Sequence, residues 1–174
     1  MNTGELYLKT AFACMACDGE IANEELELVK HFATSSTLFE GLEIEKQLNE
    51  YVAEINDQGL SFLAGYINDI VNAQLTEQQE LNLAKIAIKM IEADKKIEYS
   101  EISFFKQIRS KLNVSDEKLL DLFQDETLFE KFPEVEPEDL LLPDIKEAVD
   151  WGLNIAFQNI ALNQELKIGL DLQH

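Results

Sequence analysis

Basic residues are scarce in this chain of 174 residues. Only 14 Lys and Arg side chains stand against 34 Asp and Glu side chains, which gives a formal net charge of −20 at pH 7. So little positive charge excludes nucleic-acid binding through phosphate neutralisation, and it disfavours adhesion to an anionic membrane surface. An acidic chain of this kind is suited instead to cations, to basic protein partners or simply to high solubility.

Long apolar runs are also absent. None approaches the roughly 20 residues of a membrane-spanning helix. The N-terminal stretch carries Glu5 and Lys9 and lacks the basic start and continuous apolar segment of a signal peptide. Two cysteines are too few for a disulfide framework. We therefore expect a cytoplasmic protein that does not insert into a membrane.

The sequence motifs that are typical of enzymes are missing as well. There is no P-loop, no G-x-G-x-x-G and no nucleophile elbow. The two histidines, His31 and His174, lie too far apart in sequence to suggest a catalytic triad. His31 follows Glu27 by four residues, a spacing that on a helix usually gives a solvated pair. We expect a protein that is not an enzyme.

The apolar residues that are present recur at helical spacing, and no proline precedes Pro133. The predicted stripes are Leu8–Ala11–Phe12–Met15, Ile44–Leu48–Tyr51–Val52–Ile55, Leu63–Ile67–Ile70–Val71, Ala84–Ala87–Ile88–Ile91 and Ile102–Phe105–Ile108–Leu112. Such spacing, without strands of alternating polarity, predicts an all-α fold, a compact helical bundle. Leu83, Ile86 and Met90 make the fourth helix apolar on a second side, so we expect it to be central.

Residues 125–150 have a different composition. They hold ten acidic residues, two lysines and all three prolines, together with apolar groups such as Phe129 and Phe132. This mixture predicts an ordered acidic strap over the helices, because wholly disordered segments are usually poorer in large apolar residues. Pro143 is suited to start a final helix. The side chains expected to dock that helix are Ala148, Trp151, Leu153, Ala156, Phe157 and Ile160.

An internal repeat links residues 11–32 with residues 87–108, without a gap, at an offset of 76. The aligned pairs include Asp18 with Asp94, Ile21 with Ile97, Glu25 with Glu101 and Leu26 with Ile102. Each copy consists of an apolar helix, the turn D-x-x-I, and a second helix with a glutamate in its first turn. Gly19 in the first turn can take a positive φ at little cost, and the helix dipole favours a negative charge at the glutamate.

This pattern resembles the signature A-D-G-x-I-x-x-x-E of the TerB-like family, which is named after a tellurite-resistance protein. The first copy carries it as A-C-D-G-E-I-A-N-E-E at residues 16–25, and residues 92–101 give a weaker echo, followed by K-L-N-V-S at 111–115. The resemblance covers roughly residues 1–124 and implies a compact all-helical fold built from a duplicated unit. Members of the family occur in bacterial metal and stress-response systems, and as the N-terminal domain of a membrane-anchored DnaJ-type co-chaperone.

The resemblance also implies a divalent-cation site formed by the acids of the motif. Those acids map onto Asp18, Glu25, Asp94 and Glu101. Their oxygens suit Mg²⁺, Ca²⁺ or Mn²⁺, although Lys95 and Lys96 in the second turn would compete with a bound ion. The alternative is structural: the two aspartates serve the turns and the two glutamates serve the helix starts.

Two other motifs carry less weight. An EF-hand is excluded, because the twelfth loop position would be Val29 or Phe105 instead of glutamate. Cys14 and Cys17 form a C-x-x-C, which is found in redox pairs and in half zinc sites. Here no second cysteine pair and no βαβ pattern accompany it, so we favour two small buried residues on a packed helix.

The expected organisation is a TerB-like domain at 1–124, with repeats at about 1–58 and 59–124, and a strap with a final helix at 125–174. The expected function is non-enzymatic: binding of a divalent cation through the four acids in metal or oxyanion stress response. Direct binding of an oxyanion is disfavoured by the charge of −20. The alternative is a metal-free interaction module that docks a basic protein partner through its acidic surface.

Overall fold

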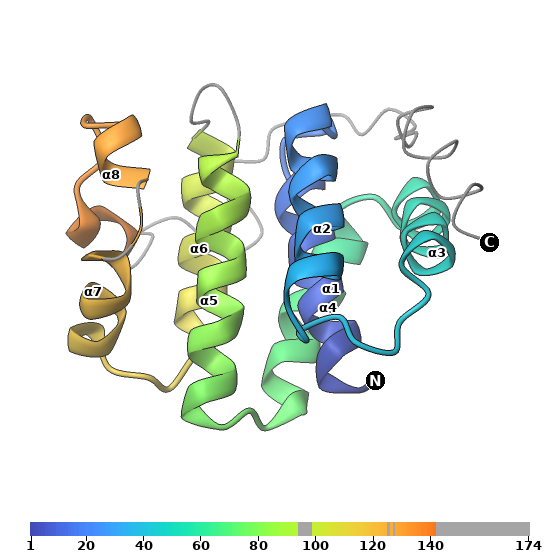
Figure 1. Ribbon diagram of the computed structural model, residues 1–174, viewed down its shortest axis with the longest axis horizontal. Coiled ribbons are helices and arrows are strands. Elements are labelled where there is room, and N and C mark those ends of the chain that lie inside the picture. Colours follow the sequence, from blue (N-terminus) through green and yellow to red (C-terminus); the bar gives the residue numbers. More distant parts are fainter. Residues whose placement is uncertain (94–98, 125, 127, 142–174) are drawn as a thin grey trace.

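The described part of the protein is entirely helical, which confirms the predicted fold class. The computed structural model describes residues 1–93, 99–124, 126 and 128–141 (Figure 1). Its elements are α1 (Thr3–Ala16), α2 (Asn23–Ser35), α3 (Ile44–Gln58), α4 (Leu60–Ala73), α5 (Glu77–Glu92), α6 (Tyr99–Ser110), α7 (Asp116–Gln124), α8 (Leu128–Lys131) and the 3-10 helix η1 (Pro137–Leu140). Within those residues, no helix is both long and apolar enough to cross a membrane.

Helices α1 and α5 form the centre of the bundle and pack against each other. Every residue from Leu6 to Cys17 is buried except Lys9. The Lys9 ammonium lies 2.7 Å from a carboxylate oxygen of Asp69 and 5.0 Å from the centre of the Phe62 ring, so its charge is compensated. Leu83, Ile86 and Met90 of α5 are buried as well, which confirms the prediction that this helix is central.

The other helices surround this pair. Helices α3 and α4 pack on α1, and α7 and α8 pack on α5. Helix α6 contacts α5, α1 and α4, so it lies between the two groups; Figure 1 shows α5 and α6 between α7–α8 and α1–α4. The ring of Phe104 on α6 lies 6.0 Å from that of Tyr66 on α4, and the Tyr66 hydroxyl is 2.6 Å from that of Thr10.

Side-chain hydrogen bonds to backbone N–H groups cap the starts of α1, α5 and α7. Asn2 accepts from the N–H of Glu5 (2.8 Å), Thr76 from that of Gln79 (3.2 Å) and Ser115 from that of Lys118 (3.3 Å). The prediction that Val71 belongs to the buried stripe of its helix is wrong, because Val71 is 51% exposed. The buried face of α4 runs through Phe62, Leu63, Tyr66, Ile67 and Ile70, and Val71 lies beside it.

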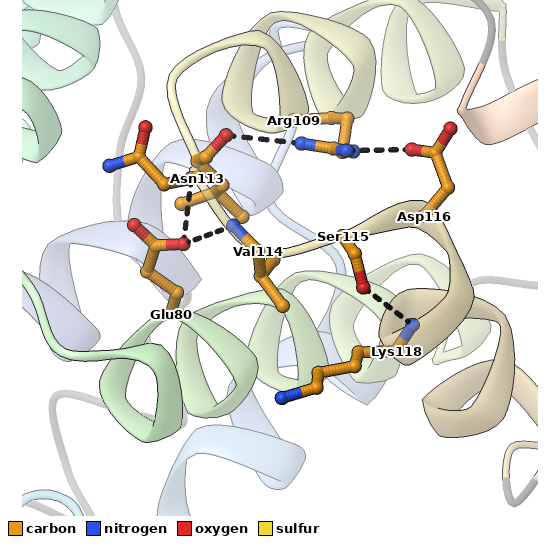
Figure 2. A network of polar contacts seen from close by, with 8 residues as sticks. Glu80, Arg109, Asn113, Val114, Ser115, Asp116 and Lys118 are labelled. Carbon is orange, nitrogen blue, oxygen red and sulfur yellow. Dashed lines mark hydrogen bonds and ion pairs between the residues drawn. The ribbon is translucent and has the colours of Figure 1, made fainter.

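A buried carboxylate fastens the connection between α6 and α7 to the central helix α5. Glu80 is 4% exposed, and its Oε1 accepts hydrogen bonds from the backbone N–H groups of Asn113 and Val114, each at 2.8 Å (Figure 2). Beside it, the guanidinium of Arg109 lies 2.6 Å from Asp116 at the start of α7. Two charge-assisted bonds to one buried group fix this connection against α5.

The described residues of the predicted strap lie against the helices. Helix α8 packs on α5, and η1 contacts α6 and α7. Leu128, Phe132 and Leu140 are buried in the core. The predicted final helix from Pro143 lies outside the described residues.

Candidate metal site at the two acidic turns

The first acidic turn follows the end of α1. Gly19 has φ +89°, which confirms the predicted left-handed conformation and explains why glycine occupies this position. Asp18 is half-buried, and its Oδ1 accepts a hydrogen bond from the backbone N–H of Glu20 at 3.0 Å. The aspartate therefore stabilises the turn itself, as the structural interpretation of the motif expects.

Glu25 stabilises the start of α2. It is the third residue of that helix and only 3% exposed, and its Oε1 accepts a hydrogen bond from the backbone N–H of Ala22 at 3.0 Å. The carboxylate also lies at the positive end of the helix dipole. These contacts agree with the predicted role at the helix start, and they bury a negative charge between the helices.

Glu101 takes the corresponding position on α6. It is the third residue of the helix and also 3% exposed. The offset between the ends of α1 and α5, and between the starts of α2 and α6, is that of the sequence repeat. The two glutamates therefore stand at the same place in helices whose bounds repeat with the sequence. Asp94, the fourth predicted ligand, lies outside the described residues.

The charges of the two glutamates meet at the C-terminal end of α1. Burial is the main cause that raises the pKa of the Cys14 thiol, and the negative charges of Glu25 and Glu101 raise it further. The same two charges, together with that of Asp18, also raise the pKa of the Cys17 thiol. Because such effects fall off with distance, three acids from different segments lie around one helix end.

The two cysteines are packing residues. Both are free, Cys14 is 6% exposed and Cys17 is 1% exposed. The Cys17 thiol donates a hydrogen bond to the carbonyl oxygen of Cys14 at 3.3 Å. A buried thiol with a raised pKa is a poor nucleophile and a poor thiolate ligand, so the interpretation as two small buried residues is confirmed.

Asp18, Glu25 and Glu101 have the right ligand atoms for a hard cation, but their described positions do not form a metal site. Carboxylate oxygens are the donors that Mg²⁺ and Ca²⁺ prefer. Among the residues that the structure describes, however, no three His, Cys, Asp or Glu side chains are placed to hold a metal ion. Asp18 and Glu25 each already accept a backbone hydrogen bond through one oxygen. The three predicted ligands that the structure describes, Asp18, Glu25 and Glu101, thus do not form a three-ligand set.

Buried charges other than the four predicted ligands escaped the sequence analysis. Glu92 and Glu126 are 8% and 6% exposed, and the Lys89 ammonium lies 3.7 Å from the first and 2.7 Å from the second. Lys89 and Glu92 share a helical spacing that also fits a solvated pair. Glu126 lies beyond the next two helices in the chain, so no local pattern could have joined it to Lys89.

Comparison with known proteins gives no match, neither among protein-family models, nor among curated proteins, nor among solved structures.

Proposed function

We propose that this chain is a non-enzymatic, TerB-like protein that binds a divalent cation between two acidic turns of a duplicated helical unit, in bacterial metal or oxyanion stress response. The observation that carries the proposal is the placement of Glu25 and Glu101. Both are 3% exposed, both are the third residue of a helix, and both act on the Cys14 thiol. The recurrence of the sequence offset in the helix bounds supports the duplicated unit.

In this proposal Glu25 and Glu101 supply carboxylate oxygens from the two halves, and Asp18 and Asp94 supply further oxygens from the turns. A divalent cation bound by both carboxylates would place positive charge beside two buried groups whose negative charges both act on the Cys14 thiol. The ion would then join the start of α2 to the start of α6. Binding would therefore stabilise the bundle, and the formal charge of −20 would add a diffuse attraction for cations.

Thermal unfolding of the full chain after EDTA treatment, with Ca²⁺, Mg²⁺, Mn²⁺ or Zn²⁺ then added, tests the proposal. A cation at about 100 times its dissociation constant stabilises the folded state by about 2.7 kcal/mol, which raises Tm by roughly 5–10 °C in a domain of this size. Glu25→Gln and Glu101→Gln should each abolish the rise. Glu117→Gln, which changes an exposed acid in the first turn of α7, should retain it.

A second candidate is the metal-free interaction module that docks a basic protein. It is favoured by the fact that no three donors converge in the described residues. This module predicts no effect of EDTA or of any cation on Tm, and association with a basic protein that weakens as salt is raised. A Tm that is unmoved by all four cations would overturn metal binding and leave this candidate.

A further inference from the structure

Helix α2 is the least anchored of the described helices. Every other described helix packs closely on at least one neighbour, whereas α2 makes only minor contacts with the other elements. Of its 13 residues, only Glu25, Leu26 and Val29 are buried. Segments with few buried apolar groups are those that open most easily while the rest of a protein stays folded.

One side of α2 faces a groove of about 470 Å³, which lies between α2, α5 and α8. Leu28 lines this groove and is only half-buried. Phe104, which the repeat aligns with Leu28, is 1% exposed on α6 and packs on Tyr66 of α4. Among the described residues, α2 therefore lacks the packing that α6 has at the equivalent position.

The chain on either side of α2 allows this helix to move. Before it, the turn passes through Gly19, whose φ of +89° is left-handed. After it, the chain leaves the helix at Ser36 in an extended conformation and reaches Phe39, which is 3% exposed. The ring of Phe32 on α2 lies 6.1 Å from that of Phe39. The helix thus hangs between a glycine turn and one anchored ring, and such short connections serve as hinges.

The start of α2 lies beside buried chemical groups of α1. The charge of Glu25 is among the causes that raise the pKa of the Cys14 thiol, so this carboxylate is close to the C-terminal end of α1. Cys14 and Cys17 are 6% and 1% exposed. Burying a carboxylate costs free energy, so returning Glu25 to water would offset part of the apolar contact that Leu26 and Val29 lose when α2 moves away.

We propose that α2 is a lid that opens as a unit and admits small solutes to the C-terminal end of α1, where Cys14, Cys17 and Glu25 are buried. The rest of the bundle stays folded while the lid is open. The solutes that fit this route are a hydrated cation and a small thiol reagent. The opening requires no bound cation, so it stands apart from the proposed cation binding.

Labelling of the two native cysteines with N-ethylmaleimide in the folded full chain tests the lid, with mass spectrometry giving the rate. Opening of one helix exposes little surface, so the rate should be nearly independent of urea well below the unfolding midpoint. A rate that rises with urea as steeply as the unfolding equilibrium itself would overturn the proposal, because the thiols would then react only in the unfolded chain.

Two matched leucine variants separate the lid from the rest of the bundle. Leu26→Ala removes a buried anchor of α2 itself and should speed labelling in water by at least about tenfold. Leu119→Ala, at a buried position of α7, should leave that rate unchanged within about twofold. Circular dichroism verifies that both variants are folded, and the urea dependence of the wild type decides if one is not. Equal acceleration in both variants, or none in Leu26→Ala, would overturn the proposal.

Hydrogen exchange shows whether α2 moves as a unit. Its amides should exchange with one common protection factor, at least about 100-fold below that of the buried amides of α6. Protection that rises gradually from the ends of α2 towards its middle would mean fraying, and protection equal to that of α6 would mean a closed helix. Either result would overturn the proposed lid.

Discussion

Helices α2 and α6 begin with the same motif but end up in different surroundings. Of α2, only Glu25, Leu26 and Val29 are buried. Of α6, Glu101, Ser103, Phe104, Phe105, Gln107 and Ile108 are buried. The cause lies outside both helices: α4, α5, α1 and η1 pack on α6, whereas α2 makes only minor contacts with the other described elements. How deeply a repeated helix is buried thus depends on what the chain places beside it.

The connections that follow these two helices show the same divergence. In the first half, α1 approaches the connection after α2 so closely that a side chain at Gly4 would come within 3.3 Å of the carbonyl oxygen of Leu38. Glu80 and Val114 stand at the equivalent positions of the second half, and there the approach is bridged by a hydrogen bond of 2.8 Å. In the first half a glycine allows the helix to lie close to the connection. In the second half a buried carboxylate binds the connection by a hydrogen bond.

The largest effect should come from truncating the aligned pair Phe104 and Leu28. Phe104→Ala removes a ring that is 1% exposed and packed on Tyr66, and it should lower the free energy of unfolding by about 3–5 kcal/mol. Leu28→Ala, at a half-buried position, should cost only about 1 kcal/mol. Urea unfolding measures both values. Equal losses would show that α2 is covered as completely as α6 in solution.

A smaller loss is expected from Glu80→Ala. The buried N–H of Val114 loses its acceptor, as does the N–H of Asn113, so the free energy of unfolding should fall by about 2–3 kcal/mol. Glu77→Ala is the control, because it removes an exposed acid from the same helix whose ion pair with Lys118 lies at the surface. That change should cost less than about 1 kcal/mol. If both variants unfold alike, the carboxylate of Glu80 does not fasten the connection.

The features that could be predicted from the sequence are those set by nearby residues. The cap at Thr76 needs only Gln79, three positions away, and the turn at Gly19 needs only its own backbone freedom. The burial of α5 was visible because its apolar residues cover two sides of the helix. Helical spacing alone misplaced Val71, since the contacts of α4 bury a narrower face than the stripe suggests.

Contacts between distant residues could not be predicted. In the sequence Glu80 is one more acid in the first turn of a helix, and the two N–H groups that donate to it lie 33 and 34 residues away. At the candidate site, the resemblance of the repeated turn to the TerB-like signature led to Glu25 and Glu101. Their common influence on Cys14 depends on how α2 and α6 pack around α1, which a single sequence does not encode locally.

A last difference between the halves concerns charge at the end of the central helices. Where α1 buries Ala13 and Ala16, α5 carries Lys89 and Glu92, and the Lys89 ammonium lies 2.7 Å from the buried Glu126. Burial raises the pKa of the Glu126 carboxyl, and the attraction of Lys89 opposes this only in part. Keeping Glu126 charged therefore costs desolvation free energy in the second half. The first half has no such cost, because alanines stand at the positions equivalent to Lys89 and Glu92.

The variant Glu126→Gln measures this desolvation cost, because it replaces the carboxylate by an uncharged amide of similar size. The pKa of Glu126 is raised in the folded state above its ordinary value of 4.5, so folding favours the protonated carboxyl. This contribution to the free energy of unfolding is complete below pH 4.5 and is lost as the pH rises through the raised pKa. At pH 7 the variant should therefore be as stable as the wild type, or more stable by up to about 1 kcal/mol. At pH 5 the difference should shrink or reverse, as urea unfolding at the two pH values would measure. A loss of more than about 1 kcal/mol at pH 7 would instead mean that the pair with Lys89 outweighs desolvation, so that the charged arrangement stabilises the second half.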